Sequence, residues 1–254
     1  MYENDFIRRA LAHRTIREFQ DIPVEEDKIN ALGEVARHTS TSIGLQWASI
    51  VRVTNPVLKK ELAEIAHQDY IARAPELWVF VADAYRNGEI AKEKGLSDHH
   101  AFDVNFFFQA FSDALLMAQN VLSAVESMKM GGCFLGSLLN DAERVIQLLH
   151  LPEGTFPALG LMFGYPAQEP QLKPRIPNAC RFFENSYSRP ESFLMSLENY
   201  DETMQTYYDL RDENRRSDTF TDQVVRKVQA PNAARNRLAR SIAHSGFKLY
   251  LEEE

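Results

Sequence analysis

Residues 101–128 constrain the fold of this chain more than any other segment, because they are apolar nearly all round. The large side chains occur on every side of the helix that this segment would form: Phe106, Phe107, Phe108, Phe111, Leu115, Leu116, Val121, Leu122 and Val125. A helix with this pattern is buried on most sides. We expect Gly131-Gly132 to end it by supplying positive φ angles. Other elements must then pack around one long helix.

The remaining elements mix helices with a few irregularly spaced strands, which favours an α+β fold over a regular βαβ repeat. Apolar spacing and capping residues predict helices after Asn4 or Asp5, after Pro23, after Asn55-Pro56, after Asn140 and near Asp218. Strands are expected over residues 47–54, 77–82, 133–135 and 157–163. We treat residues 1–254 as one domain, in which residues from about 183 onward form a helical arm or lid.

Charge and cysteine content exclude several classes of protein. The formal net charge of -8 argues against a general nucleic-acid binder, because no basic field covers a whole face. Cys133 and Cys180 are far apart and form no CxxC, so we expect no disulfide and a reducing compartment. The polar start does not resemble a signal peptide, and no stretch approaches the length of a membrane span. The sequence therefore predicts a cytoplasmic protein.

Two short basic runs stand out in this acidic chain. The first is His13-Arg14-Thr15-Ile16-Arg17, just after the first expected helix, and the second is Lys173-Pro174-Arg175. Arginine donates two parallel hydrogen bonds to phosphate oxygens, so the runs predict a shared anionic ligand, most plausibly a phosphate. Each run alone also fits a solvated cationic turn or a plain surface loop.

Other common sites lack their signals. The chain has neither GxGxxG nor GxxxxGK[ST], which leaves a Rossmann site or a P-loop without support. Asp98-His99-His100 is not accompanied by further ligands at suitable spacing, so we expect an exposed loop and no metal there.

Several segments, taken in order, resemble the flavin-dependent nitroreductase family over nearly the whole chain. They are residues 13–17, the polar loop Thr39-Ser40-Thr41-Ser42 ahead of Leu45-Gln46, Gln68, residues 76–80, Gly131-Gly132 before Phe134-Leu135-Gly136, residues 164–167, residues 172–175 and Glu184-Asn185-Ser186-Tyr187. The similarity is greatest to the larger NADPH-preferring branch of oxygen-insensitive nitroreductases and flavin reductases. No single motif decides the matter, but their order and spacing together are specific.

The resemblance implies an α+β homodimer with a central, mostly antiparallel sheet and one FMN held non-covalently in each of two interface sites. It assigns His13, Arg14, Thr15, Arg17 and Arg175 to the phosphate and ribityl end of FMN, and Lys173 to the flavin pyrimidine. It assigns the polar edge of the ring to Thr41, Ser42 and Gln68. It places Leu135, Gly136 and Ser137 at the cofactor, with the backbone N–H of Gly136 near N5.

The resemblance also implies that Arg211 and Arg216 bind the 2′-phosphate of NADPH. Nearby Asp209, Asp212 and Glu213 allow the alternative of a salt-bridged helix surface. A further arginine expected ahead of the last helix falls near Pro231-Asn232-Ala233, where Arg235 or Arg237 is a candidate substitute.

The function implied is reduction of FMN by NAD(P)H, followed by two-electron transfer to a planar acceptor by ping-pong kinetics. Nitroaromatics, quinones, azo compounds and free flavin remain candidate acceptors. A flavin carrier or redox sensor without turnover, on the same fold, is the alternative.

Overall fold

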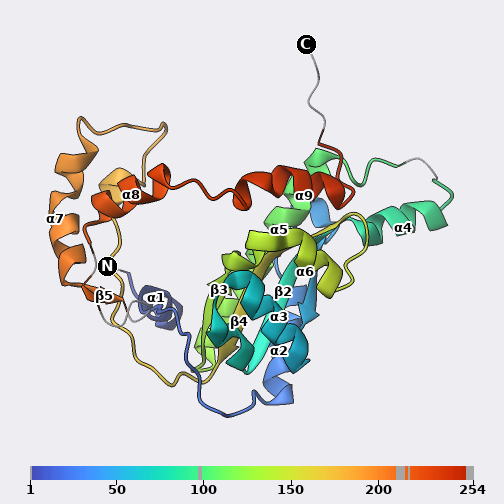
Figure 1. Ribbon diagram of the computed structural model, residues 1–254, viewed down its shortest axis with the longest axis horizontal. Coiled ribbons are helices and arrows are strands. Elements are labelled where there is room, and N and C mark those ends of the chain that lie inside the picture. Colours follow the sequence, from blue (N-terminus) through green and yellow to red (C-terminus); the bar gives the residue numbers. More distant parts are fainter. Residues whose placement is uncertain (1, 97–98, 210–214, 217, 250–254) are drawn as a thin grey trace. The chain divides into compact units, whose positions relative to one another are not determined.

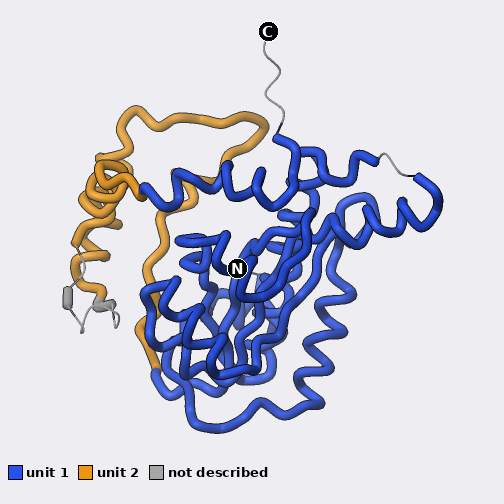
Figure 2. The backbone as a smooth tube through the Cα atoms, turned by 45° about the vertical axis from the view of Figure 1, so that its right-hand side comes forward, with its two compact units in different colours: residues 1–168, 233–254 blue, residues 169–232 orange. Residues whose placement is uncertain are grey.

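The structure is a computed structural model that describes residues 2–96, 99–209, 215–216 and 218–249. Two compact units divide the chain. Unit 1 comprises residues 1–168 and 233–254, and unit 2 comprises residues 169–232 (Figure 2). Among the described residues, no helix is both long and apolar enough to cross a membrane.

Unit 1 is built on a four-stranded antiparallel sheet, as the resemblance implies (Figure 1). The strands lie in the order β1 (Ala48–Arg52), β2 (Glu76–Asp83), β4 (Thr155–Gly164) and β3 (Gly131–Leu135). The helices of this unit are α1 (Asp5–Leu11), α2 (Glu26–Arg37), α3 (Pro56–Ala66), α4 (Tyr85–Glu93), α5 (Val104–Ser127), α6 (Ala142–Leu148) and α9 (Leu238–His244). The α+β expectation is confirmed.

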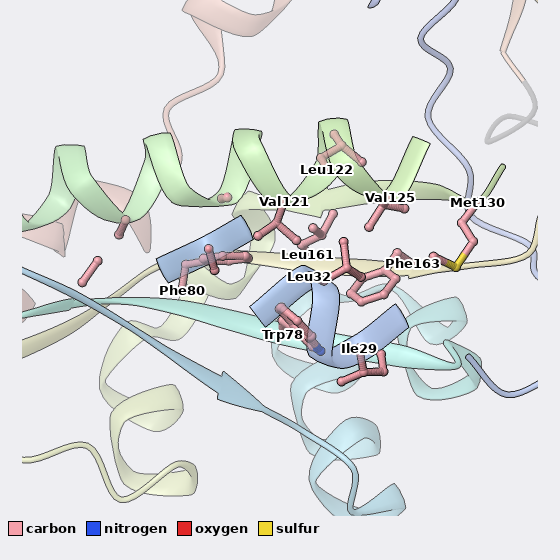
Figure 3. Close-up of a cluster of buried hydrophobic side chains, with 14 of the residues drawn as sticks. Ile29, Leu32, Trp78, Phe80, Val121, Leu122, Val125, Met130, Leu161 and Phe163 are labelled. Atoms are coloured by element: carbon pink, nitrogen blue, oxygen red, sulfur yellow. The ribbon is translucent and has the colours of Figure 1, made fainter. Parts of the chain in front are cut away.

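Both faces of the sheet are covered, which explains why β2 is buried along its whole length. Trp78 and Phe80 of β2 pack with α2 and α5, where Leu32 and Val121 are fully buried (Figure 3). The alternate residues of β2 pack on the other face, against α3, β3 and α6. A strand buried on both faces reads as a continuous apolar run rather than an alternating one.

The long helix α5 is not buried on most sides, contrary to the expectation from its composition. One side packs on the sheet, where Ala114, Ala118 and Val121 are fully buried. On another side Phe108 is 63% exposed and Leu116 is 53% exposed. An exposed row of large apolar residues is typical of a surface that another protein covers.

Gly131 and Gly132 do not end α5, so that prediction is wrong. The helix ends at Ser127, and Lys129 supplies the positive φ of 61°. Both glycines lie in β3, at positions where a side chain would collide with neighbouring atoms. A Cβ on Gly131 would lie 2.4 Å from Cγ1 of Ile16, and one on Gly132 would lie 2.9 Å from the carbonyl oxygen of Met162.

Local capping chemistry sets most helix starts as expected. The side chain of Asn4 accepts a hydrogen bond from the backbone of Ile7, and Asn55 caps α3 with Pro56 in the first turn. For α6 the expected cap was one residue early. Asp141 accepts from the backbone of Arg144, whereas Asn140 donates to the carbonyl of Ile65.

Unit 2 is smaller and combines two helices with long stretches of coil. It contains α7 (Phe193–Thr206) and α8 (Phe220–Gln229), with a short antiparallel pair, β5 (Tyr208–Asp209) and β6 (Arg215–Arg216). Its core consists of Leu197, Tyr200 and Met204 of α7, with Phe220 packed against them. The helix expected near Asp218 is present as α8, capped by Thr219.

Candidate functional site

The basic run after α1 is tied directly to the central sheet. Thr15 forms a parallel β-bridge with Gly132, and the backbone N–H of Ile16 donates to the Gly132 carbonyl at 3.0 Å. The side chain of Ile16 is 5% exposed and lies against Gly131. The backbone of the run is therefore held against β3, and successive side chains point to opposite sides of it.

Arg14 and Arg17 each have a buried Nε atom without a hydrogen-bond partner among the residues that the structure describes. The Nη1 atom of Arg14 donates to the carbonyl of Ala12 at 3.1 Å. An open cavity of about 560 Å³ lies beside Arg17. The other charged residues in its lining are Arg73, Glu18 and Asp21. Because a buried donor without a partner loses its hydration, both guanidinium groups are suited to an anionic ligand.

His13 does not stand free in solvent. Its Nδ1 atom lies 2.5 Å from Oε1 of Glu126, which is in the last turn of α5. Nearby, Nη1 of Arg9 donates to the carbonyl of Ser127 at 2.6 Å. The end of α5 therefore fixes both the histidine and the helix that precedes it.

The polar loop expected at the flavin edge is held from inside by one buried carboxylate. Asp113 of α5 is 1% exposed, and its two oxygens accept from the backbone N–H groups of Ser42, at 2.7 Å, and Trp47, at 3.1 Å. Between these two points the chain takes positive φ angles, including 46° at Ile43. Positive φ is costly for a β-branched residue, so the loop conformation is imposed by its surroundings.

Donors from α4 hold the same loop from the other side. The side chain of Asn87 donates to the carbonyl of Leu45 at 3.1 Å, and Arg86 donates to the carbonyl of Gln46. Thr41, the other residue expected at the ring, directly precedes the short helix Ser42–Gly44. The structure thus presents Thr41 and Ser42 at the start of a firmly held loop.

Gln68 and the segment after β3 are in contact with each other. The hydroxyl of Ser137 donates to Oε1 of Gln68 at 2.8 Å. Leu135 ends β3 and is 1% exposed, and Gly136 follows it at the start of the short helix Gly136–Asp141. A Cβ on Gly136 would meet only the end of one arginine side chain, at 3.8 Å. Among the described residues, the Arg235 guanidinium is thus the group nearest to a side chain placed at Gly136.

Arg235 precedes α9 in the chain. Its guanidinium donates to the carbonyl of Gly136 and, through Nε, to Oδ1 of Asn140 at 3.3 Å. Arg235, a candidate for binding the nicotinamide nucleotide, thus contacts the segment that the resemblance places at the flavin.

Lys173 and Arg175 lie in unit 2, in the coil ahead of α7. The phenol of Tyr200 donates to the carbonyl of the intervening Pro174 at 3.2 Å, which attaches this coil to α7. Burial raises the pKa of Tyr200, and the positive charge of Arg175 opposes that shift.

The remaining candidates are less fully described. Arg211 lies outside the described residues, and for Arg216 only the backbone, in β6, is described. Asp98 also lies outside them, while His100 is exposed and pairs with Asp103 at 3.0 Å. No group of three or more potential metal ligands occurs within the described part of the chain.

Sequence reasoning missed Asp113 and Glu126. Both are acidic residues on an apolar helix, and Asp113 sits in the middle of its most buried part. A buried carboxylate requires hydrogen-bond donors, so its position in an apolar segment was a usable signal. The identity of those donors depends on tertiary contacts across 66 to 113 residues.

Comparison with known proteins identifies the family of the chain. Residues 10–165 match the sequence pattern of the "Nitroreductase family", and residues 173–250 match that of the "Nitroreductase family, C-terminal domain". The chain is 35% identical to the FMN reductase (NADPH) of Bacillus subtilis, covering 87% of this chain and 90% of that protein. It is 37% identical to the oxygen-insensitive NADPH nitroreductase of Salmonella typhimurium, covering 89% and 92%.

Solved structures give the same result. The NADPH:FMN oxidoreductase of Vibrio harveyi, solved in complex with NAD+, superposes with a TM-score of 0.86 at 33% identity, over 97% of this chain and 100% of that one. Nitroreductase A of Vibrio parahaemolyticus superposes with a TM-score of 0.88 at 33% identity, over 98% and 100%.

Proposed function

The chain belongs to the nitroreductase family, and from this premise we propose that it is an FMN-dependent oxidoreductase that uses NAD(P)H to reduce planar acceptors. Nitroaromatics, quinones and free flavin are the acceptor classes. The names of its relatives, an FMN reductase and a nitroreductase that use NADPH, support this activity.

The observation that carries the cofactor assignment is the pair of buried Nε atoms of Arg14 and Arg17, which have no hydrogen-bond partner among the described residues. Such donors gain when an anion supplies the missing acceptors. The FMN phosphate is such an anion. We assign His13, Arg14, Thr15 and Arg17 to that end of the cofactor and, on the resemblance, Arg175.

The other end of the cofactor is assigned to the polar loop and to the segment after β3. Thr41, Ser42 and Gln68 would hydrogen-bond the polar edge of the ring, and Lys173 would lie at the pyrimidine. Gly136 leaves room for close approach because it has no side chain. FMN supplies the chemistry when bound, by accepting two electrons at N5 from NAD(P)H and passing them to the acceptor.

We propose that the working form is a homodimer with FMN at the interface. The exposed apolar side chains of α5, Phe108, Leu115 and Leu116, support a protein partner on that helix. A second copy of the chain would cover these residues and exclude water from the site.

The first test is the visible absorption spectrum of the purified protein before and after NADPH. The proposal expects a yellow protein that NADPH bleaches and that a quinone or nitroaromatic restores with turnover. A yellow protein that is bleached but shows no turnover would instead be a flavin carrier or sensor. A colourless protein that does not take up added FMN would contradict the cofactor assignment.

Steady-state kinetics test whether the nicotinamide and the acceptor use one shared site. Initial rates measured against both substrates should give parallel double-reciprocal lines, because the first product leaves before the acceptor binds. Intersecting lines would show that both substrates are bound together, which would contradict the shared site.

A further inference from the structure

The contact between His13 and Glu126 has no role in the function proposed so far. The two side chains are 113 residues apart in the sequence and come from the loop after α1 and the last turn of α5. Both are mostly buried, with 29% and 18% of the side chain exposed, and the Nδ1 to Oε1 distance is 2.5 Å. The carboxylate therefore meets the imidazole at short hydrogen-bonding distance, away from most of the solvent.

The position of Glu126 is unfavourable for the helix that carries it. The C-terminal turn of a helix has a partial negative charge, so a carboxylate there is repelled. Among the described residues, Glu126 forms an ion pair with His13. Pairing with the imidazole is what offsets the unfavourable position.

The contact also fixes the hydrogen on the imidazole ring. An ionised carboxylate only accepts hydrogen bonds, so Nδ1 of His13 carries the hydrogen. The remaining ring nitrogen, Nε2, is then the atom left to contact a ligand. A phosphate dianion is also an acceptor, so His13 must carry a second hydrogen on Nε2 to bind it.

We propose that Glu126 is a positioning residue that orients His13 so that its Nε2 donates to the phosphate of FMN. This inference rests on the proposed function, which places His13 at the phosphate. Glu126 fixes the orientation of the ring through Nδ1, while Arg9 joins α1 to the end of α5 beside it. The net effect is attraction, although Glu126 itself is negative and would repel a phosphate directly.

Replacing the carboxylate of Glu126 by an amide weakens its hold on His13 and also removes its direct repulsion of the phosphate. The sign of the change in FMN affinity shows which of the two effects is larger. In Glu126→Gln the side-chain oxygen still reaches Nδ1, but the charge is gone. We expect the dissociation constant for FMN to rise about tenfold, because the imidazole would be held by a neutral amide oxygen in place of a carboxylate. The dissociation constant for riboflavin, which lacks the phosphate, should change less than about twofold. Both are measured by flavin fluorescence quenching on the apoprotein.

The chain offers a matched control in a second histidine–glutamate pair. In unit 1, Nδ1 of His244 lies 3.1 Å from Oε1 of Glu143, between α9 and α6. Glu143→Gln removes the same charge from the same kind of pair, and it should leave the preference for FMN over riboflavin unchanged. His13→Gln should reduce that preference, and adding Glu126→Gln to it should cause no further loss.

The outcomes distinguish the two levels of the argument. If Glu126→Gln tightens FMN binding or leaves the FMN-to-riboflavin preference unchanged, the positioning role is wrong and the proposed function still stands. An equal loss for both flavins would show a purely structural role and would also overturn the inference. A wild-type protein that binds neither flavin would overturn the proposed function, and this inference with it.

Discussion

The two basic runs look alike in the sequence but have different structural support. Residues 13–17 form a β-bridge with β3, and Ile16 is buried against the sheet. Residues 173–175 lie in a coil of unit 2, where the phenol of Tyr200 donates to the Pro174 carbonyl and the next residue, Ile176, packs on the α7 core. The first run is therefore preformed by the main core, whereas the second depends on the smaller unit.

This difference matters for binding because a ligand that orders a loose segment loses affinity to the entropy of ordering. The core of unit 2 contains Leu197, Tyr200 and Met204, whereas unit 1 has three larger clusters around its sheet. Some substitutions remove a side chain that contacts the ligand, and others disturb only the support that holds such a side chain in place. Comparing the two kinds separates the loss of a contact from the loss of preorganisation.

The largest effect is expected from removing a charged donor in either run. Arg14→Ala and Arg175→Ala should each weaken FMN binding by roughly 2–3 kcal/mol, the scale of a hydrogen bond to a charged group. Titration of apoprotein with FMN measures this. Arg8→Ala, an exposed arginine of α1 paired with Asp5, is the matched control and should bind FMN normally. Wild-type affinity in both site variants would remove the phosphate assignment.

A smaller effect is expected from disturbing the support of the first run without touching its charges. In Gly131→Ala the new Cβ would lie 2.4 Å from Ile16, so the free energy of unfolding should fall by about 1–3 kcal/mol. Gly33→Ala is the control, because no atom lies within 4 Å of a Cβ there and alanine favours a helix interior. If both variants have equal stability by chemical denaturation, the packing of Ile16 on β3 is not what fixes the run.

The nicotinamide assignment tests unit 2 in a different way. Arg216→Ala should raise KM for NADPH roughly tenfold more than KM for NADH, because only NADPH carries a 2′-phosphate. Arg226→Ala, in α8 and paired with Asp218, serves as the control. Equal increases for the two nucleotides would mean that Arg216 does not contact that phosphate.

The smallest effect is expected from loosening the second run. Tyr200→Phe removes the hydrogen bond to Pro174, so FMN binding should weaken by about 0.5–1.5 kcal/mol, less than in Arg175→Ala. The double variant should lose little more than Arg175→Ala alone, because Tyr200 acts by placing that coil. Fully additive losses would mean that Tyr200 has an independent role.

Local chemistry predicted most of the fold. The Asn55-Pro56 pair, the apolar run of β2 and the spacing of α2 each determine their element from within the segment. The glycines at 131 and 132 were misassigned because their role depends on Ile16 and Met162, which are distant in sequence. Likewise, which side of α5 is exposed depends on the elements that pack against it, and the composition of the helix does not reveal them.

The candidate site could be proposed from the sequence where basic residues gather in short runs, as at 13–17 and 173–175. The contacts behind the candidate residues could not be proposed in that way. Asp113 reaches Ser42, Glu126 reaches His13 and Arg235 reaches Gly136 only after the chain has folded. Resemblance to a family identifies residues that face a ligand more readily than the residues behind them.

The β-bridge between Thr15 and Gly132 couples ligand binding at residues 13–17 to the folding of the sheet. A ligand held by residues 13–17 binds the folded sheet and not the unfolded chain, so occupancy and resistance to denaturation rise together. Free ligand at one hundred times its dissociation constant adds about 2.7 kcal/mol to the free energy of unfolding. Scarcity of the vitamin from which the cofactor is made would thus leave this protein not merely inactive but shorter-lived.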